Sequence, residues 1–254
     1  MRLKDKVAII TGSGRGMGRA VALKFAEEGA CVVVNYLQSV ESAQAVLKEI
    51  TQKGGKAIGV KADISSILDR KRLLDETLRE FGRLDVLVNN AGLELRVPLE
   101  EINEDDWIKV TKVNVMAPFF LSRDAFKIME PQRNGKIINV TSLTGILPSA
   151  TNIVYRVSKS ALIHLTKCLA LAFAPDVQVN GIAPGLMETQ MKGSKELSAE
   201  EKQISSKRRP LKRLGTLSEI AHLFVYLASD DSRYITGEVI NFDGGFSIST
   251  LMSN

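Results

Sequence analysis

The sequence predicts an α/β fold in which a doubly wound, seven-stranded parallel sheet carries helices on both faces. Short runs rich in β-branched residues alternate with longer amphipathic stretches along the whole chain, and this rhythm is typical of βαβ units. The short runs are almost continuously apolar, as expected for strands that are covered on both faces. Right-handed crossovers between such strands produce the doubly wound arrangement.

Seven strands and six helices are expected, in alternation. The predicted strands are short, apolar and β-branched, and they span Val7–Ile10, Cys31–Asn35, Ala57–Val60, Val86–Val88, Lys136–Val140, Val177–Ile182 and Val239–Phe242. The predicted helices have apolar residues at helical spacing, and they span Gly18–Glu28, Glu41–Lys53, Ile67–Phe81, Glu104–Met129, Val154–Phe173 and Leu217–Leu227.

The chain is expected to form a single domain over residues 1–254. Its length allows one large domain or two small ones, and it contains no internal repeat, low-complexity segment or obvious linker. The least regular long stretch, residues 186–214, is predicted to be a substrate lid, because such a segment in a compact domain is usually a functional lid or disordered. It contains the basic run Lys207–Arg209.

Composition and charge exclude several classes of protein. The chain has 44% apolar and 25% charged residues, which is ordinary for a globular domain. Its two cysteines, Cys31 and Cys168, form no disulfide framework or CxxC motif, so we expect reduced thiols and a cytoplasmic location. No apolar run approaches the roughly 18 residues of a membrane span. The net charge of +5 comes without a recognition helix or zinc finger, so we expect no nucleic-acid partner.

A glycine-rich turn follows the first predicted strand and opens the first helix. Glycine lets the backbone approach a phosphate closely, and a helix N-terminus supplies N–H groups and a positive dipole end. GxGxxG and P-loop spacings are both absent, and the spacing present is TGxxxGxG. A turn that binds no ligand is the alternative. The predicted cofactor-binding residues of this turn are Gly12, Ser13, Gly14, Arg15, Gly16, Met17 and Gly18.

The end of the second strand favours NADP(H) over NAD(H). An acidic residue there would bind the ribose 2′-hydroxyl and repel a 2′-phosphate. The chain instead reads Asn35-Tyr36 at this point and has no acid before Glu41. Arg15 in the turn is a candidate bidentate donor to the 2′-phosphate, although an exposed surface arginine is the alternative reading. Asn35 and Tyr36 are therefore included among the predicted cofactor-binding residues.

Three residues form a candidate catalytic group. Tyr155 and Lys159 are four apart in a predicted helix, so they share one helix face. A nearby ammonium is expected to lower the pKa of Tyr155 from about 10 and make it a general acid for a carbonyl oxygen. Ser142, at the end of the fifth strand, lies on the edge of an open α/β sheet where ligands bind. No HExxH or calcium-loop spacing occurs, so no catalytic metal is expected.

These motifs together resemble the short-chain dehydrogenase/reductase family over nearly the whole chain. The resemblance rests on the glycine-rich turn, the Ser142, Tyr155 and Lys159 set, and further pieces that occur in the family's order: Asp63, Asn89-Asn90-Ala91-Gly92, Asn114 and Pro184-Gly185…Thr189. It implies a Rossmann-like fold. It further implies that Asp63 and Ile64 lie at the adenine ring, and that Asn89, Asn90, Ala91 and Gly92 line the cofactor cleft.

The resemblance also implies roles near the reacting atoms. Asn114 would hold a water in a proton relay through Lys159. Lys159 would bind the nicotinamide ribose, and Pro184, Gly185 and Thr189 would lie along the nicotinamide and its phosphates. Family members are commonly tetramers, so a homotetramer is expected.

Within the family, the chain is most similar to the 3-oxoacyl-[acyl-carrier-protein] reductases. Segments such as Arg213-Leu214-Gly215 and Asp243-Gly244-Gly245 carry this similarity, although sugar and alcohol dehydrogenases share them. The stretch Pro148–Val154, whose residues should border the substrate, departs from the subgroup, which tends to have small residues and a glutamine just before the tyrosine. The predicted function is NADPH-dependent reduction of a ketone to an alcohol, with a 3-oxoacyl thioester of the fatty-acid-synthesis type as substrate.

Two alternatives remain open. One is an NADP(H)-dependent ketone, sugar or alcohol dehydrogenase of the same family. The other is a non-catalytic NADP sensor, against which the complete set of Ser142, Tyr155 and Lys159 argues. The basic run Lys207–Arg209 is either a solvated face or a contact for an acyl carrier protein or a coenzyme A phosphate.

Overall fold

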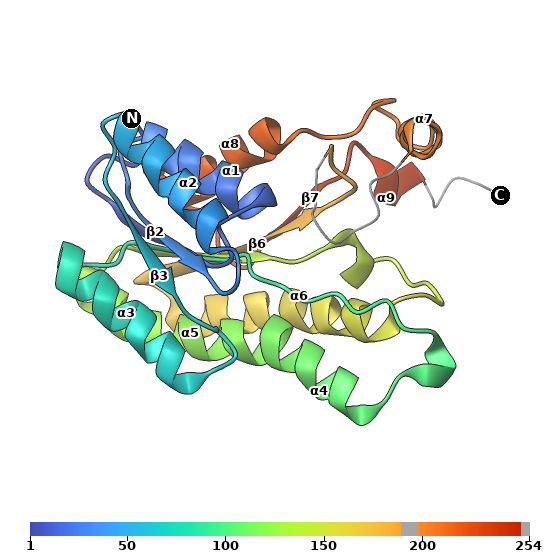
Figure 1. Ribbon diagram of the computed structural model, residues 1–254, viewed down its shortest axis with the longest axis horizontal. Coiled ribbons are helices and arrows are strands. Elements are labelled where there is room, and N and C mark those ends of the chain that lie inside the picture. The colour runs from blue at the N-terminus through green and yellow to red at the C-terminus, as the bar shows by residue number, and fades with distance from the viewer. Residues whose placement is uncertain (189–197, 250–254) are drawn as a thin grey trace.

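The computed structural model describes residues 1–188 and 198–249, and its strands form a parallel sheet in the order β3-β2-β1-β4-β5-β6-β7 (Figure 1). All seven predicted strands are confirmed, each within two residues of the expected bounds. They are β1 Val7–Ile10, β2 Cys31–Tyr36, β3 Ala57–Lys61, β4 Val86–Asn89, β5 Gly135–Val140, β6 Val177–Pro184 and β7 Val239–Phe242.

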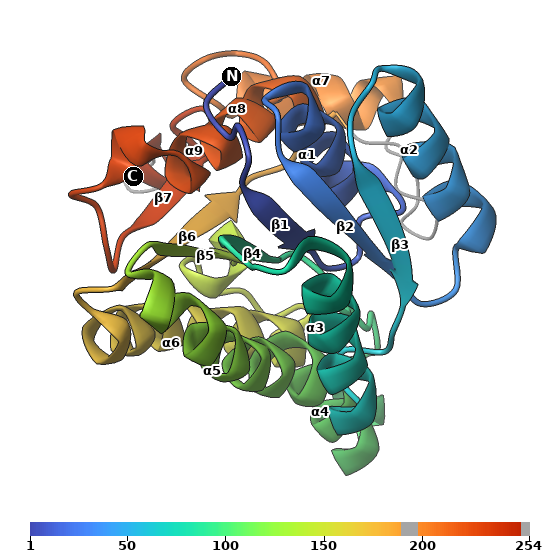
Figure 2. The same ribbon diagram turned by 90° about the vertical axis from the view of Figure 1, so that its left-hand side faces the viewer.

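Helices cover both faces of this sheet, which confirms the doubly wound fold (Figures 1 and 2). One face carries α1, α2 and α8, and the other carries α3, α5 and α6. The main helices are α1 Gly16–Glu27, α2 Val40–Gln52, α3 Ile67–Phe81, α4 Glu104–Thr111, α5 Ala117–Met129, α6 Ile153–Phe173 and α8 Leu217–Ala228. Within the part of the chain that the structure describes, no helix is both long and apolar enough to span a membrane.

The sheet separates two hydrophobic cores, and the strands supply side chains to both. Ala8 and Ile10 of β1 belong to the core under α1, α2 and α8, whereas Ile9 between them belongs to the core over α3, α5 and α6. This follows from the two-residue period of a strand. Since both faces are covered, both positions must be apolar, which is why the strands read as continuous apolar runs.

The predicted helix over residues 104–129 is wrong in one respect, because the structure divides it into three pieces. Between α4 and α5 lies a π-helical turn, η2 Lys112–Met116, and Pro118 follows in the first turn of α5. A π turn inserts an extra residue into the helical path and often marks a functional site. Here the turn contains Asn114, which is fully buried.

The region predicted as an irregular lid contains a helix that the sequence reading missed, α7 Ala199–Lys207. A capping box begins it, with Ser198 and Glu201 each bonding the other's backbone N–H. The basic run that follows is not uniformly exposed, because Arg209 is buried and its guanidinium lies 5.1 Å from the Phe246 ring centroid. The remaining short helices are η1 Leu99–Glu101, η3 Glu130–Gln132, η4 Leu143–Gly145, η5 Asp230–Ser232 and α9 Phe246–Ser249.

The strand order determines where a ligand can bind. The chain runs outward from β1 to β3 on one side, then returns to place β4 directly beside β1, with Ile10 opposite Val88. The crevice at such a reversal, outside the carboxyl ends of the strands, is the usual ligand site of an open α/β sheet. The loops that follow β1 and β4 meet there.

Candidate active site

The glycine-rich turn after β1 is bonded to the loop after β4. Thr11 Oγ1 accepts hydrogen bonds from the backbone N–H groups of Asn90 and Ala91 at 2.9 and 3.0 Å. In return, Asn90 Nδ2 donates to the carbonyl oxygens of Thr11 at 2.7 Å and Gly12 at 3.2 Å. The predicted cofactor-binding residues of these two loops are thus brought together.

Glycine is required in this turn for two different reasons. Gly12 and Gly16 have φ angles of +63° and +56°, in the left-handed region that most side chains avoid. At Gly18 the reason is space, since an added Cβ would lie 2.5 Å from Asn90 Nδ2 and 2.6 Å from the Gly12 carbonyl oxygen. These contacts explain the TGxxxGxG spacing in terms of backbone geometry.

The start of α1 fits an anionic group. The helix begins at Gly16, its N-cap is the exposed Arg15, and its first turn contains no acidic residue. The side chain of Arg15 makes no capping hydrogen bond to the first turn. Backbone N–H groups and the positive end of the helix dipole therefore favour a phosphate at this point. Met17, also predicted here, lies half-buried in the first turn.

Two of the predicted cofactor-binding side chains act within the protein. Ser13 is fully buried, and its Oγ donates to the Ile10 carbonyl oxygen at 2.7 Å. Asn35 accepts from the Gly12 N–H at 3.1 Å and donates to the Val60 and Ala62 carbonyl oxygens at 3.3 and 3.0 Å. Both side chains bond backbone groups of the protein and stabilise the turn, so any contribution they make to cofactor binding is indirect.

The other predicted cofactor residues lie along the same edge of the sheet. Tyr36 ends β2 and pairs with Lys61 of β3. Asp63 follows β3 and accepts the Ser65 N–H at 2.8 Å, and the next residue, Ile64, is buried. At the far side, Gly185 follows Pro184 of β6 and donates its N–H to the Phe242 carbonyl oxygen at 2.8 Å. The last predicted residue, Thr189, lies outside the described residues.

Ser142, Tyr155 and Lys159 converge at the end of β5. Ser142 follows that strand, and its hydroxyl lies near enough to Tyr155, in the first turn of α6, to lower the pKa of the phenol. Lys159, one turn further along, donates from Nζ to the Val140 carbonyl oxygen at 2.7 Å. Its Nζ lies 5.7 Å from the Tyr155 ring centroid. The structure thus brings together the three residues that the sequence singled out as catalytic.

The protonation of this group differs from expectation. Burial raises the pKa of Tyr155 to about 12, the negative charge of Glu94 adds to the rise, and the hydrogen bond from Ser142 opposes it. Burial lowers the pKa of Lys159 to about 8. The pKa of Tyr155 thus shifts in the direction opposite to the one expected from Lys159, because desolvation by burial is the largest cause of the shift. The phenol is protonated at neutral pH and can donate a proton.

Asn114, the fourth predicted catalytic residue, lies beside this group. Its Oδ1 accepts the Leu93 N–H at 2.8 Å, and its Nδ2 donates to the Leu93 carbonyl oxygen at 2.8 Å and to Ser158 Oγ at 3.0 Å. A Cβ added at Gly92 would lie 3.5 Å from both Asn114 Oδ1 and Lys159 Nζ. Asn114 therefore ties the loop after β4 to α6, while its part in a water relay stays a prediction.

Asn89 belongs to a buried polar network behind the site. Its Nδ2 donates to Asn139 Oδ1 at 2.8 Å and to Ser122 Oγ at 3.0 Å. Asn139 in turn donates to Thr166 Oγ1 at 3.0 Å. This network joins β4 and β5 to α5 and α6 across one core and orients the strand ends that carry the site. The sequence reading did not identify Asn139.

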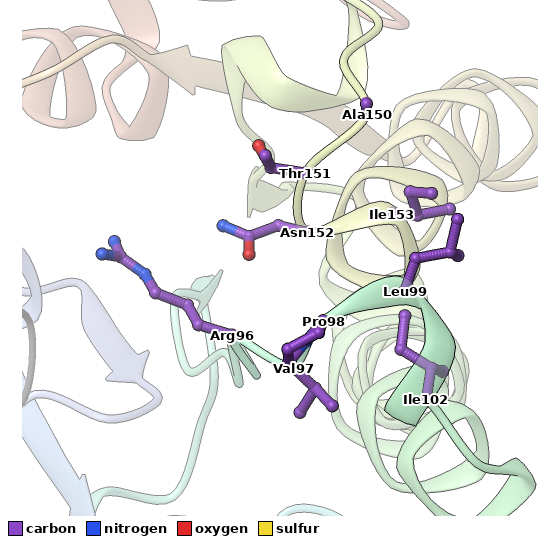
Figure 3. A pocket seen from close by; sticks show the side chains of 9 residues that line it. All are labelled: Arg96, Val97, Pro98, Leu99, Ile102, Ala150, Thr151, Asn152 and Ile153. Carbon is purple, nitrogen blue, oxygen red and sulfur yellow. The ribbon is translucent and has the colours of Figure 1, made fainter.

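A cavity of about 300 Å³ opens at the N-terminal end of α6 (Figure 3). Its wall comes from the loop after β4 and from the loop between η4 and α6. Apolar side chains gather on one side of it, and polar groups of Arg96, Thr151 and Asn152 point to the other (Figure 3). The apolar lining residues are Val97, Pro98, Leu99, Ile102, Ala150 and Ile153.

Sequence reasoning missed Glu94 and Arg96 at this rim, whereas Thr151 and Asn152 lie in the stretch 148–154 that was expected to border the substrate. Glu94 accepts hydrogen bonds from Asn152 Nδ2 at 2.7 Å and from Arg96 Nε at 3.2 Å. No motif contains Glu94 or Arg96, and their one signal is that they follow Asn89-Asn90-Ala91-Gly92 closely. Among residues 1–188 and 198–249, no three His, Cys, Asp or Glu side chains gather in a group that could hold a metal ion.

Known proteins with similar sequences and structures are oxidoreductases. A family model described as enoyl-(acyl carrier protein) reductase matches residues 12–247. A 3-oxoacyl-[acyl-carrier-protein] reductase, FabG, of Thermotoga maritima is 39% identical over 254 residues, which cover 98% of this chain and 100% of the relative.

Solved structures show the same likeness. A short-chain dehydrogenase/reductase of Serratia marcescens superposes with a TM-score of 0.90 at 35% identity, covering 97% of this chain and 100% of the other. A gluconate 5-dehydrogenase of Burkholderia cenocepacia, in complex with NADP and tartrate, superposes with a TM-score of 0.89 at 33% identity, covering 97% of both chains.

Proposed function

The chain belongs to the short-chain dehydrogenase/reductase family, and on that premise we propose that it reduces a ketone to an alcohol with NADPH. The observation that carries the proposal is the convergence of a neutral Tyr155 phenol, Ser142 and Lys159 at the end of β5. A protonated acid on the ligand-binding edge of the sheet is what carbonyl reduction needs.

The residues present fit a nicotinamide dinucleotide. Its phosphates would accept hydrogen bonds from the free backbone N–H groups at the N-terminus of α1. The close approach of the backbone at Gly18 keeps the turn after β1 tight. Gly92 leaves the surface beside Asn114 and Lys159 free of a side chain. The cofactor, when bound, supplies the hydride. Lys159 would hold it through the ribose, and Pro184, Gly185 and Thr189 would lie along its nicotinamide end.

The protein's part in the reaction is to orient the carbonyl and move one proton. Thr144 donates to Ser142 Oγ from its N–H at 3.1 Å and from its hydroxyl at 2.9 Å. These bonds leave the Ser142 hydroxyl hydrogen to point at Tyr155. A carbonyl oxygen that enters between the two receives a hydrogen bond from Ser142 and the proton of Tyr155. Lys159, with its charge buried beside the ring, stabilises the phenolate that results.

NADP(H) is the proposed cofactor rather than NAD(H). No acidic residue lies between the end of β2 and Glu41, so nothing in that segment repels a 2′-phosphate. Arg15 is exposed at the N-cap of α1 and supplies the matching positive charge. The Burkholderia relative, which binds NADP, supports this choice.

For the substrate we propose a 3-oxoacyl thioester, in line with the Thermotoga relative. The apolar side of the cavity beside α6 supports an acyl group as part of the substrate. A sugar or alcohol dehydrogenase of the same family is the second candidate, and the polar groups of Arg96, Thr151 and Asn152 at the rim favour it. A non-catalytic NADP sensor would have no use for the acid.

A partner protein and a tetramer belong to the same proposal. Lys207 and Arg208 are exposed at the end of α7 and would meet an acidic acyl carrier protein. Trp107, Ile108 and Phe119 are exposed apolar side chains on α4 and α5, as expected if these helices pair in a homotetramer. Molar mass by light scattering tests the assembly. As in the sequence reading, a cytoplasmic location is proposed for the enzyme.

The first experiment follows the loss of NADPH absorbance, then of NADH, with acetoacetyl-coenzyme A as substrate. Fast oxidation of NADPH that depends on the thioester supports a fatty-acid-type reductase. Tight NADPH binding without turnover keeps the fold and cofactor but contradicts the acyl substrate. A panel of ketones, sugars and alcohols then tests the second candidate. NADPH binding without turnover of any of them would favour the sensor.

A further inference from the structure

Two loops that lie far apart in the sequence are joined at the rim of the cavity beside α6. One follows β4 and supplies Glu94, and the other precedes α6 and supplies Asn152. The hydrogen bond from Asn152 Nδ2 to Glu94 Oε1 is 2.7 Å long. Both loops line the cavity, and Asn152 is itself one of the lining residues. The distance between the two walls therefore depends on this contact.

The backbone of Asn152 has a left-handed conformation, and its side chain does not cap the helix that follows. Asn152 occupies the N-cap position of α6, where an asparagine side chain normally accepts an N–H of the first turn. Its φ and ψ are 53° and 42°, in the left-handed region, and it makes no capping hydrogen bond. The side chain reaches Glu94 instead. Asparagine adopts this region more readily than most residues do, so the conformation is available without large strain.

Arg156 holds the same loop from the helix side. It donates from Nε to the Thr151 carbonyl oxygen at 2.7 Å and from Nη1 to the Leu147 carbonyl oxygen at 2.8 Å. The guanidinium thus bridges two backbone positions of the segment that leads into Asn152. With Arg156 on one side and Glu94 on the other, the segment is fixed at both ends.

Glu94 connects this rim to the acid. Besides Asn152, it accepts from Arg96 Nε at 3.2 Å, and its charge contributes to the raised pKa of Tyr155. The carboxylate is therefore near enough to the phenol to influence it. A change in the rim would alter the shape of the cavity and the room for the part of a substrate that lies in it.

The cavity next to the rim suits the apolar part of a substrate. Val97, Leu99, Ile102 and Ile153 lie together on one side of it (Figure 3). Its volume of about 300 Å³ is at the lower end of the range for ligand pockets. An apolar group of several carbons fits such a space, and the width of the space decides how large that group can be.

We propose that the Glu94–Asn152 hydrogen bond, supported by Arg156, is a latch that sets the width of this cavity and selects carbonyl substrates by the size of their apolar group. The proposal rests on the proposed carbonyl reduction. In it, Glu94, Asn152 and Arg156 are positioning and specificity-determining residues that do not touch the reacting atoms.

The test uses ethyl esters of acetoacetate, butyrylacetate and benzoylacetate, in which the apolar group grows while the reacting carbonyl stays the same. We expect Asn152→Ala and Glu94→Ala each to change KM for the two bulky esters about fivefold or more relative to acetoacetate, with kcat for acetoacetate and the Kd of NADPH close to wild type. Glu94→Gln keeps an acceptor for Asn152 and should retain the wild-type size dependence. Glu101→Gln, an exposed carboxylate on the same loop, is the matched control.

The double variant Glu94→Ala/Asn152→Ala completes the test. Because both changes remove the same hydrogen bond, its effect on KM should equal that of one single variant rather than their product. Multiplicative effects, equal changes for all three esters, or loss of size dependence in Glu101→Gln would overturn the latch. If the wild-type enzyme oxidises NADPH with none of the carbonyl substrates, the proposed reaction is overturned and the latch with it. Wild-type turnover with unaltered size dependence in the alanine variants would overturn the latch alone.

Discussion

The cofactor side and the substrate side of this crevice are held together in different ways. On the cofactor side, the side chains of Thr11 and Asn90 bond backbone groups of the facing loop, next to a turn in which Gly12 and Gly16 have positive φ angles. On the substrate side, Glu94, Asn152 and Arg156 join loops through side chains near the surface. The first region therefore depends on a backbone turn that requires glycine, whereas the second depends on the side chains of Glu94, Asn152 and Arg156.

The two regions should therefore differ in how many amino-acid substitutions they tolerate. A backbone turn that only glycine can adopt has few alternative sequences, so one binding mode persists wherever the fold is kept. Loops joined by side chains can be rebuilt without disturbing the sheet. Relatives named as a 3-oxoacyl reductase and as a gluconate dehydrogenase share this scaffold, as expected if cofactor binding is retained while the substrate rim varies.

The largest effect is expected where the two regions meet. Replacing Tyr155 by Phe removes the proton donor but keeps the ring, so turnover should fall by about 10²–10⁴-fold. The Kd of NADPH, measured by fluorescence titration, should stay within about twofold of wild type, since the phenol supplies little binding. Ser142→Ala is the companion variant, expected to lose less. Wild-type-like rates in Tyr155→Phe would contradict the assignment of the acid.

A second prediction concerns the turn after β1, which is changed without altering the substrate side. In Gly18→Ala the new methyl group collides with Asn90 and the Gly12 carbonyl, and such overpacking costs about 1–3 kcal/mol of unfolding free energy. Urea unfolding measures this loss, and NADPH binding should weaken with it. The control is Gly14→Ala in the same turn, where an added Cβ meets Ala43 and Ser39 at ordinary contact distances. Equal stability of the two variants would show that the close approach is unimportant.

A third prediction sharpens the comparison by changing charge without changing the turn. A charge-assisted hydrogen bond from Arg15 to a 2′-phosphate is worth about 1.5–3 kcal/mol, so Arg15→Ala should lower the NADPH-over-NADH preference about 10- to 100-fold. Initial rates with each cofactor give the ratio of kcat/KM values. Arg19→Ala, which removes an arginine paired with Glu49 at 2.5 Å, should leave the preference unchanged. Equal losses with both cofactors would argue that Arg15 does not distinguish them.

The smallest effect is expected on the substrate side, at the end of α7. Exposed charge pairs are each worth about 0.2–1 kcal/mol, so Lys207→Glu and Arg208→Glu should each raise KM for a carrier-linked substrate about two- to fivefold. KM for a small ketone should not change. The control is Lys48→Glu, an exposed lysine on α2. Equal effects on the two substrates would count against a carrier contact, and Arg209 is left out because it is buried.

The parts of this molecule that the sequence predicted correctly are those with a local physical cause. Continuous apolar runs predict strands covered on both faces, and the seven strands follow them. The glycine-rich turn and the four-residue spacing of Tyr155 and Lys159 are local patterns as well. A capping box at Ser198 and Glu201 was also visible in the sequence, and it would have predicted α7 within the supposed lid.

What only the tertiary structure decided involves groups that approach across the fold. Asn114 lies in a π turn and bonds Leu93 and Ser158, and the helical period of the sequence predicted neither. The raised pKa of Tyr155 depends on burial and on Glu94, whereas its distance in sequence from Lys159 suggested the opposite shift. The sequence by itself determined the sheet, the turn and the catalytic side chains, because local sterics and hydrophobic period produce them. The protonation of Tyr155 and the contacts at the cavity rim depend on the tertiary structure, because burial and long-range contacts exist only in the folded chain.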